Sequence, residues 1–315
     1  MSATLALSDG RAGNARQARA LAEALDADTR TLELQPRAPW RWLAPHRLPG
    51  SGHAFGTEFA QALVQPPGLA IGCGRQAALA TRLLRARGSK VVQVLDPRLD
   101  SRHWDVVIAP EHDGLRGDNI VSTLGSLHPV DDLWLARARQ AFPALGDLPL
   151  PRTLLLVGGP SKHAALRDIE FDALLQRLAM LATRERGSFS AIASRRTPQR
   201  WRKALARIPV EVPGAHWRDA RDGENPYAGM LAWADRIVCT PDSVNMLSEA
   251  AATLAPMFVW APERVHGRPR GFLAALRASG RMRNADDEWQ PFDAEPLRET
   301  ARVAELLRQR LDLAP

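Results

Sequence analysis

Cysteine, lysine and long apolar runs are all scarce in this sequence of 315 residues. The two cysteines, Cys73 and Cys239, sit in or beside apolar runs, which predicts buried, reduced thiols and a cytoplasmic protein. The longest uninterrupted apolar runs have about six residues, far short of the ~20 that span a bilayer. No basic segment precedes the first apolar stretch, so we expect no secretory signal peptide.

The positive charge of the chain comes almost wholly from arginine. Of 42 basic residues only Lys90, Lys162 and Lys203 are lysines, and the formal net charge is +7. Such an excess attracts anionic partners, which are nucleotides, phospholipid surfaces or nucleic acid. The arginines are scattered rather than clustered, and this distribution disfavours nucleic acid as a partner.

Apolar strand-like runs alternate with helical segments in both halves of the sequence. The helical segments carry apolar residues at helical spacing, as at Leu174, Leu178 and Leu181. Strands that are apolar throughout and alternate with amphipathic helices are typical of parallel sheets covered on both faces. The sequence therefore predicts an α/β protein with two Rossmann-like, doubly wound domains. The expected strands are 4–8, 69–74, 90–96, 105–110, 152–159, 188–194, 236–240 and 256–262.

A segment rich in proline, FPALGDLPLP at 142–151, marks the expected domain boundary. The domains would span 1–146 and 147–295, and an amphipathic helix in 296–315 would pack back on the first domain. Ligands of open α/β sheets bind at the carboxyl ends of the strands. The residues that follow each strand are therefore the candidates for function.

Asp9, Gly10, Gly13 and Asn14 follow the first strand. The two glycines let backbone N–H groups approach a ligand closely, and Asn14 is a good residue for a helix N-cap. A helix N-terminus at this place attracts phosphate or carboxylate. The pattern is GxxGN and lacks the GxGxxG of a dinucleotide fingerprint. The structural alternative is a glycine-rich turn capped by Asn14.

The strand at 152–159 leads into a second glycine-rich turn, GGPSKH, with Gly158, Gly159 and Ser161. This turn lacks the GK[ST] ending of a P-loop, which argues against a Walker-type nucleotide hydrolase. After the next strand, SRRTP places Arg195, Arg196 and Thr197 at the same sheet edge. Paired guanidinium groups suit phosphate oxygens, and a solvated surface pair is the alternative.

Glu111, His112 and Asp113 form a compact titratable cluster after the strand at 105–110. A histidine between two acids would serve as a general base or a metal ligand. Consecutive residues rarely chelate one metal, and no HxxxH or CxxC pattern accompanies them, so we expect no metal site. Ordinary loop polarity is the alternative to catalysis.

The segment IVCTPDSVNMLSEA contains Asp242, Ser243 and Glu249. Asp242 is the expected N-cap of a helix, and Ser243 would expose a hydroxyl at the helix start. The spacing from Asp242 through Met246 to Glu249 places all three on one helix face. A carboxylate at that depth would accept hydrogen bonds from a ribose diol, as acids do in nucleotide-binding folds. An exposed helix glutamate is the alternative.

Tryptophan and arginine are mixed in PRAPWRWLAPHRLP at residues 36–49, which include Trp40 and Trp42. Tryptophan is enriched at membrane interfaces, and arginine binds anionic headgroups. This loop is therefore either a contact with an anionic membrane surface or a segment packed on its own domain.

Several motifs together resemble the mitochondrial fission ELM1-like family, for which nucleoside-diphosphate-sugar epimerase activity has also been suggested. In chain order they are LSDGRAGNARQARALAEAL, VLDPR, VIAPEHDGL with GDNIVSTLGSLHPV, VGGPSKH, SRRTP, ENPYAGMLAWADRIVCTPDSVNMLSEA and RASGRMR. The family in turn looks like the GT-B glycosyltransferase fold, with two Rossmann-like domains facing across a cleft. More distantly, the arrangement is similar to the MurG family of peptidoglycan enzymes, which bind a UDP-sugar in the second domain.

The resemblance implies roles for particular residues. The loop after the first strand would meet acceptor and diphosphate, the GGPS loop would open the donor domain, and Glu249 would bind ribose. The first loop lacks the histidine of the peptidoglycan enzymes, so the base would come from Asp9, Glu111 or His112. The implied nucleotide-sugar contacts are Gly10, Gly13, Asn14, Gly158, Gly159, Ser161, Arg195, Arg196, Thr197, Asp242, Ser243 and Glu249.

The implied function is a metal-independent glycosyltransferase with a cell-envelope or lipid-linked acceptor. Its substrate would be a UDP- or GDP-linked sugar, and no separate cofactor is implied. The protein would be cytoplasmic and would lie at the inner face of the cytoplasmic membrane. Helix N-termini and Arg195 or Arg196 would stabilise the leaving diphosphate. Two alternatives stay open, a nucleoside-diphosphate-sugar epimerase on the same fold and a non-catalytic, membrane-associated scaffold. The oligomeric state does not follow from the sequence.

Overall fold

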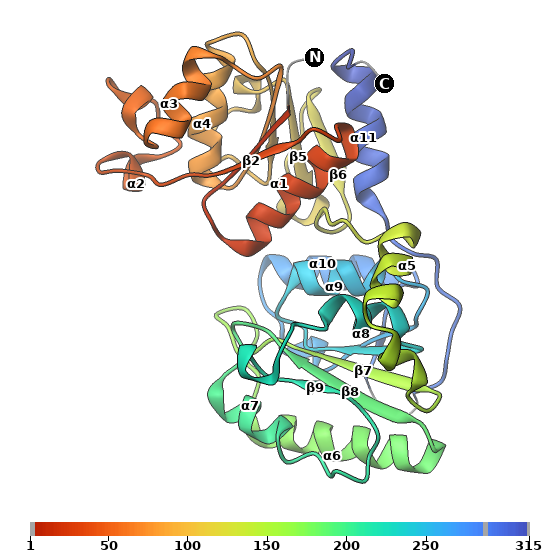
Figure 1. Cartoon of the computed structure of the whole chain (residues 1–315). Coiled ribbons are helices and arrows are strands. Elements are labelled where there is room, and N and C mark those ends of the chain that lie inside the picture. Colours follow the sequence, from red (N-terminus) through yellow and green to blue (C-terminus); the bar gives the residue numbers. More distant parts are fainter. Residues whose placement is uncertain (1–3, 286–288, 314–315) are drawn as a thin grey trace. The chain divides into compact units, whose positions relative to one another are not determined.

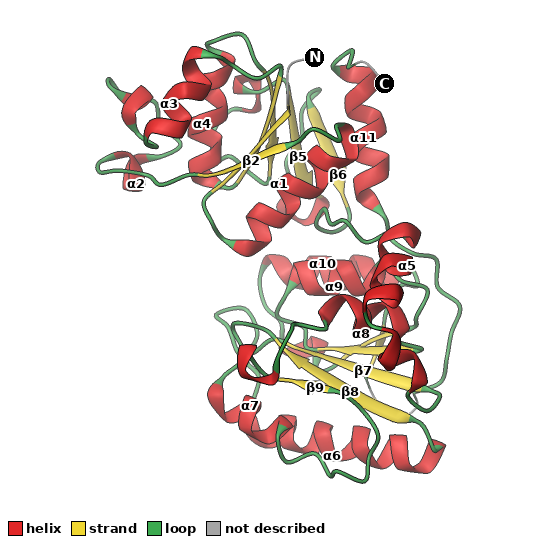
Figure 2. Cartoon of the chain, viewed as in Figure 1, coloured by secondary structure: helices red, strands yellow, loops and turns green. Residues whose placement is uncertain are grey.

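The computed structural model describes residues 4–285 and 289–313, and it divides the chain into two compact α/β units (Figure 1). Unit 1 comprises the chain up to Pro129 and from Arg298 onward, and unit 2 comprises residues 130–297. Each unit holds one six-stranded sheet with helices packed around it (Figure 2). All neighbouring strands pair in parallel, which confirms the predicted pair of doubly wound sheets.

The sheet of unit 1 has the strand order β2-β1-β3-β4-β5-β6. Its strands are β1 (Thr4–Ser8), β2 (Arg30–Glu33), β3 (Leu69–Cys73), β4 (Lys90–Val94), β5 (Val106–Pro110) and β6 (Ile120–Thr123). Its helices are α1 (Ala12–Leu25), α2 (Trp40–Leu43), α3 (Thr57–Val64), α4 (Arg75–Arg85) and α11 (Glu299–Arg310).

Both faces of the unit 1 sheet are covered, because successive residues of a strand point to opposite faces. Leu5 and Leu7 of β1 belong to a buried cluster with α4, whereas Ala6 between them belongs to a second cluster with α1 and α11. The helix α11 thus returns to unit 1 and packs against α1. The strand β1 is buried along its whole length as a result.

The sheet of unit 2 has the strand order β12-β11-β10-β7-β8-β9. Figure 1 shows α6 and α7 on one side of this sheet and α9 and α10 on the other. The strands are β7 (Arg152–Val157), β8 (Ser188–Ala193), β9 (His216–Trp217), β10 (Arg236–Cys239), β11 (Met257–Val259) and β12 (Arg283–Asn284). The helices are α5 (Asp132–Ala141), α6 (Asp168–Glu185), α7 (Gln199–Leu205), α8 (Tyr227–Trp233), α9 (Val244–Ala251) and α10 (Arg268–Ala278).

The division between the units falls earlier in the chain than residue 146, the boundary set from the sequence. The helix α5 belongs to unit 2 because it packs against α8, and Arg139 Nε donates to the carbonyl of Ala232 at 2.9 Å. The proline-rich stretch after α5 also lies inside unit 2, where a Cβ atom on Gly146 would stand 2.8 Å from the ring of Trp233. A proline-rich segment therefore does not mark the boundary in this chain.

Two further expectations concern burial and membrane crossing. Cys73 and Cys239 are both free and buried, as predicted, and burial raises the pKa of both thiols. Within the part of the chain that the structure describes, no helix is long and apolar enough to cross a membrane.

Candidate functional site

The candidate site in unit 2 lies where the strand order of its sheet reverses. The chain runs from β7 outward through β8 to β9, and then returns to lay β10 on the other side of β7. The loops after β7 and β10 therefore diverge from adjacent strands, and this is the place where open α/β sheets bind ligands. Unit 1 has a similar reversal between β1 and β3.

A chain of hydrogen bonds joins the loops that follow β7 and β10. The backbone N–H of Gly158 donates to Oγ1 of Thr240 at 2.7 Å, and Thr240 donates in turn to Oδ1 of Asp242 at 2.7 Å. A Cβ atom on Gly158 would stand 2.1 Å from the same Asp242 oxygen. The absence of a side chain at position 158 is therefore what lets the Asp242 carboxylate lie against the first loop.

The loop after β8 joins the same cluster through Arg196 and Thr197. Arg196 Nη2 donates to Oδ2 of Asp242 at 2.9 Å, and the Asp242 side chain is 1% exposed. Buried Thr197 donates to the carbonyl of Val157 at 2.7 Å, which ties its loop to the end of β7. The neighbouring Arg195 is exposed. The carboxylate of Asp242 thus serves to hold three loops together.

Gly159 and Ser161 shape the rest of the GGPSKH turn. A Cβ atom on Gly159 would stand 2.8 Å from Cδ of Pro198 and 3.0 Å from the carbonyl oxygen of Arg196, so only glycine fits beside the loop after β8. Ser161 is exposed, and its backbone N–H donates to the carbonyl of Ala164 at 3.0 Å. Gly159 is therefore a packing position, whereas Ser161 lies on the surface of the turn.

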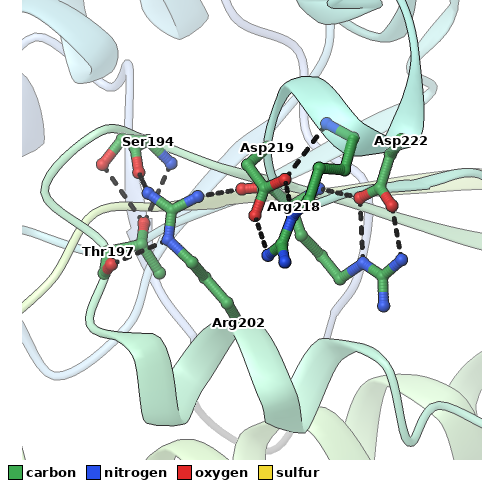
Figure 3. Close-up of polar contacts among 7 residues, drawn as sticks. Ser194, Thr197, Arg202, Arg218, Asp219 and Asp222 are labelled. Atoms are coloured by element: carbon green, nitrogen blue, oxygen red, sulfur yellow. Dashed lines mark hydrogen bonds and ion pairs between the residues drawn. The ribbon is translucent and has the colours of Figure 1, made fainter.

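Arg202 of α7 fixes the loop after β8 from below, and sequence reasoning missed it (Figure 3). Its Nε donates to the carbonyl of Thr197 at 3.0 Å and its Nη2 to the carbonyl of Ser194 at 2.6 Å. Its Nη1 donates to the carbonyl of Arg218, which follows β9. Buried Trp201 holds α7 in place, because its ring stacks on Phe171 of α6 at 4.0 Å. No spacing pattern signals such bonds from a side chain to backbone carbonyls.

The loop after β9 is held by two arginine–aspartate pairs. Arg218 donates through its backbone N–H and its Nε to Oδ2 of Asp222, at 2.7 and 2.8 Å (Figure 3). Arg221 donates to both carboxylate oxygens of Asp219 at 2.8 Å. The hydrogen bonds from Arg218 lower the pKa of Asp222 to about 2, and those from Arg221 lower the pKa of Asp219 further still. Both aspartates are thus held as anions.

The helix α9 begins one residue later than expected. Its N-cap is Ser243, whose Oγ accepts the backbone N–H of Met246 at 3.4 Å, so the prediction of Asp242 as the N-cap is wrong. Asp242 is turned back toward Thr240 and Arg196 instead. The Ser243 hydroxyl satisfies an otherwise unbonded N–H of the first helical turn.

Glu249 is buried in the second turn of α9, with 4% of its surface exposed. Its Oε2 accepts a hydrogen bond from the hydroxyl of Tyr227 at 2.5 Å. Tyr227 is the only tyrosine in the sequence and begins α8. The alternative of an exposed helix glutamate is therefore wrong, because Glu249 is buried and paired with a phenol of α8.

In unit 1 the corresponding loops bring Asp9, Asn14 and Gly74 together. Asn14 Nδ2 donates to Oδ1 of Asp9 at 2.9 Å, and a Cβ atom on Gly74 would stand 2.5 Å from Asn14 Nδ2. The helix α1 begins at Ala12, before Asn14, and its N-cap is Arg11, so the prediction of Asn14 as the N-cap is wrong. Gly13 lies within α1.

Gly10 is a position that requires glycine. It has a φ of +73°, and a Cβ atom there would stand 2.2 Å from Oε1 of Glu33. The left-handed backbone strains any other residue, and a side chain would also displace the Glu33 carboxylate. The turn after β1 is therefore tight, and it brings Asp9 to the end of the sheet.

The titratable cluster after β5 lies apart from Asp9. Glu111, His112 and Asp113 form a single 3-10 turn that ends at Gly114, and Glu111 is exposed. Two strands, β3 and β4, separate β5 from β1, which corresponds to about 14 Å across the sheet. Asp9 and His112 therefore follow strands that are not neighbours in the sheet. In residues 4–285 and 289–313, no three His, Cys, Asp or Glu side chains are grouped so as to hold a metal ion.

Comparison with models of known families shows to which family this chain belongs. The family model described as mitochondrial fission ELM1 matches residues 12–311. The chain belongs to the mitochondrial fission ELM1 family. The resemblance inferred from the sequence motifs is thereby confirmed.

Two curated relatives place this ELM1-family protein among bacterial and plant sequences. It is 29% identical over 279 residues to the mitochondrial fission protein ELM1 of Arabidopsis thaliana, which covers 78% of this chain and 64% of the plant protein. It is 25% identical to an uncharacterized protein of Rickettsia prowazekii, with 96% of each chain covered. The chain thus spans slightly under two thirds of the plant relative and nearly all of the bacterial one.

Solved structures with the same fold are enzymes of sugar chemistry. The UDP-GlcNAc 2-epimerase of Methanocaldococcus jannaschii matches with a TM-score of 0.52 at 12% identity, covering 98% of this chain and 100% of the enzyme. The spinosyn forosaminyltransferase SpnP matches with a TM-score of 0.51 at 16% identity, covering 100% and 96%. Heptosyltransferase II of E. coli matches with a TM-score of 0.50 at 14% identity, covering 99% and 98%. These likenesses confirm the fold class expected from the sequence.

Proposed function

We propose that this ELM1-family protein is a glycosyltransferase that binds a nucleotide-sugar at the carboxyl edge of the unit 2 sheet. The observation that carries the proposal is the cluster of Gly158, Arg196 and Asp242 at the strand reversal, directly before α9. The loops there are held by one another, as a preorganised site requires. The likeness to a UDP-GlcNAc 2-epimerase and to two glycosyltransferases supports a sugar nucleotide as the ligand.

The diphosphate would lie against the loops after β7 and β8. The glycines at 158 and 159 let these loops pack closely on one another, and exposed Arg195 stands on the neighbouring loop. Arg196 has five N–H donors, and its bond to Asp242 uses one of them. Both guanidinium groups and the N-terminus of α9 would stabilise the charge of the leaving diphosphate without a metal ion.

The nucleoside would lie along α9, with its ribose at Glu249. An ionised carboxylate accepts about four hydrogen bonds, so the bond from Tyr227 is compatible with a diol at the same group. The paired phenol fixes the direction in which the carboxylate points. Thr197 and Ser243 take part indirectly, since their hydroxyls order the loop after β8 and the start of α9.

The acceptor would be a cell-envelope or lipid-linked hydroxyl, deprotonated by Asp9, Glu111 or His112 of unit 1. Asp9 is the better placed of these on topology, because it follows β1 at the strand reversal of its own sheet. The protein would act in the cytoplasm, where nucleotides are available and free thiols such as Cys73 stay reduced.

The experiment that tests the donor site is a thermal-shift screen with UDP, GDP, CMP, dTDP and their sugars. A ligand at 100-fold excess over its dissociation constant adds about 2.7 kcal/mol to the free energy of unfolding. We expect one nucleotide to stabilise the wild type and Glu249→Gln to lose that shift. Glu263→Gln, at a side chain that is 69% exposed in the same unit, is the matched control. A shift that survives in Glu249→Gln would contradict the assignment.

A second candidate is a nucleoside-diphosphate-sugar epimerase, which the likeness to a UDP-GlcNAc 2-epimerase favours. Both candidates share the donor site, so product analysis separates them. An epimerase changes the sugar when the nucleotide-sugar is supplied alone, whereas a glycosyltransferase needs an acceptor. If no nucleotide stabilises the protein, a non-catalytic scaffold becomes the better proposal, in keeping with the fission role in the name of the plant relative.

A further inference from the structure

The segment between Glu33 and Glu58 contains no acidic residue. It carries Arg37, Arg41 and Arg47. No acidic residue within the segment offsets these arginines, so this stretch of unit 1 carries a net positive charge, as several other stretches of the chain do. Its charge would be complementary to an anionic partner.

Two neighbouring apolar side chains stand exposed in the middle of this segment. Trp42 is 66% exposed and Leu43 is 44% exposed, both on the short helix α2. Trp40 on the same helix is turned inward and packs against the core of unit 1. Because Trp40 anchors α2 to the core, Trp42 and Leu43 are exposed on a helix that is held in place.

The backbone around α2 is held by bonds to α4 and to the following loop. Gln76 Nε2 donates to the carbonyl of Arg41 at 2.8 Å, and Arg82 Nη1 donates to the carbonyl of Pro45 at 2.8 Å. The N–H of Arg37 donates to the carbonyl of Ala54 at 2.9 Å. Figure 1 shows α2 at the margin of unit 1, on the side of the sheet away from α11. The exposed residues are thus displayed by an ordered segment.

We propose that Arg37, Arg41, Trp42, Leu43 and Arg47, the α2 patch, dock unit 1 on an anionic lipid bilayer. Trp42 and Leu43 would enter the interface between headgroups and acyl chains, while the arginines contact the headgroups. A lipid surface satisfies both features of the patch at once. Nucleic acid would use the arginines and stack on Trp42, but it offers no apolar phase for Leu43.

This proposal goes beyond the donor site and does not depend on it. The α2 patch lies wholly in unit 1, whereas the donor residues lie in unit 2. Loss of nucleotide binding would leave membrane docking intact, and the reverse also holds. The two proposals can therefore fail separately.

The experiment is co-sedimentation of the full chain with vesicles of phosphatidylcholine alone and of phosphatidylcholine with one quarter phosphatidylglycerol. We expect binding to the anionic vesicles only. Trp42→Ser with Leu43→Ser should lower the partition coefficient about tenfold or more, since the apolar side chains no longer leave water. Arg37→Gln, Arg41→Gln and Arg47→Gln should each lower it about fivefold.

The matched control variants change exposed residues of unit 2. Ile169→Ser with Met180→Ser removes two apolar side chains that are 74% and 71% exposed. Arg184→Gln, Arg207→Gln and Arg270→Gln together remove three exposed charges elsewhere. Neither control should change vesicle binding. All changed side chains of the apolar pair and its control are exposed, so thermal unfolding should stay close to that of the wild type.

Three outcomes would overturn the proposal. One is equal binding to neutral and anionic vesicles, and another is binding that the patch variants and the unit 2 controls reduce alike. The third is an absence of vesicle binding together with an RNA gel shift that the patch variants abolish, which would assign the α2 patch to nucleic acid.

Discussion

Gly158 and Asp242 lie so close together that no side chain fits between them. A Cβ atom at residue 158 would stand 2.1 and 2.3 Å from the two carboxylate oxygens of Asp242. The two residues follow β7 and β10, the adjacent strands at which the sheet order of unit 2 reverses. The contact is therefore the point at which the two halves of this sheet are joined at its carboxyl edge.

Replacement of Gly158 by alanine should destabilise the protein. The added methyl group would push the Asp242 carboxylate away from Thr240 and Arg196, at a cost of about 1–3 kcal/mol, as is usual for overpacking. The measurement is the midpoint of urea unfolding, followed by tryptophan fluorescence. Gly52→Ala is the control, because a Cβ atom there meets only Leu63 at 3.6 Å. If the two variants unfold alike, the loops at residue 158 are looser than the structure shows.

Tyr227 offers a direct probe of the proposed donor site. It is the only tyrosine in the chain, and it donates to Glu249. Protein labelled with 13C-tyrosine should therefore give the signals of one ring in an NMR spectrum. We expect these signals to move when the stabilising nucleotide is added, because the ribose would compete for the Glu249 carboxylate.

Two variants serve as controls for the NMR measurement. Tyr227→Phe removes the labelled signals and so confirms their origin. Glu249→Gln should change the signals of the free protein and abolish the response to nucleotide. A nucleotide that binds, as judged by thermal shift, yet leaves the Tyr227 ring unmoved would place the nucleoside away from α9.

Arg202 should matter for both stability and nucleotide affinity. Its three donated bonds join the loop after β8 to the loop after β9, and each hydrogen bond from a charged group contributes about 1.5–3 kcal/mol. Lysine cannot span the three carbonyls, so Arg202→Lys should lower the urea midpoint and weaken nucleotide binding severalfold. Lys203→Ala, at the exposed neighbouring residue, is the control and should do neither. An Arg202→Lys protein with unchanged affinity would confine Arg202 to folding.

The central strands of both sheets could be predicted from sequence, and the edge strands could not. The four strands that went unrecognised, β2, β6, β9 and β12, are the outer strands of the two sheets. β2 is mostly exposed, and β9 and β12 have two residues each, so none of these three carries the continuous apolar run that marks a strand buried on both faces. Hydrophobic patterning detects burial, and edge strands are less buried.

The candidate site was predicted in part, for a related reason. Gly158, Arg196 and Asp242 could be found because each follows a central strand, where parallel sheets gather loops. That Asp242 points inward, and that Ser243 rather than Asp242 caps α9, depends on the local path of the backbone. The role of Arg202 depends on hydrogen bonds to backbone carbonyl groups. Every residue has such a group, so no pattern of residue types predicts this role.

His216 makes the stability of unit 2 sensitive to mild acid. It lies on β9 against the ring of Phe189, and its Nδ1 is buried with no hydrogen-bond partner within residues 4–285 and 289–313. Burial, together with the charge of Arg218, lowers its pKa from 6.5 to about 4. The His216 imidazole therefore binds a proton near pH 6.5 in the unfolded chain, but only near pH 4 in the folded chain.

The sign of the effect follows from this order of pKa values. The contribution to stability is fully present above pH 6.5 and is lost as the pH falls toward 4. A pKa lowered by about 2.5 corresponds to about 3 kcal/mol, since one pKa unit is worth about 1.4 kcal/mol. His216→Phe keeps an aromatic ring beside Phe189 and removes the titration. The free energy of unfolding of this variant should fall less than that of the wild type between pH 7 and 4.5.

Urea unfolding at steps of half a pH unit measures the difference between the two proteins, which cancels the titration of the carboxylates they share. His266→Gln, at an exposed histidine of the same unit, is the control and should follow the wild type. Parallel curves for the wild type and His216→Phe would mean that the imidazole reaches water in solution. In that case β9 would be less tightly packed on β8 than its paired backbone indicates, and the arginine–aspartate loop that follows it would be less firmly placed beside the donor site.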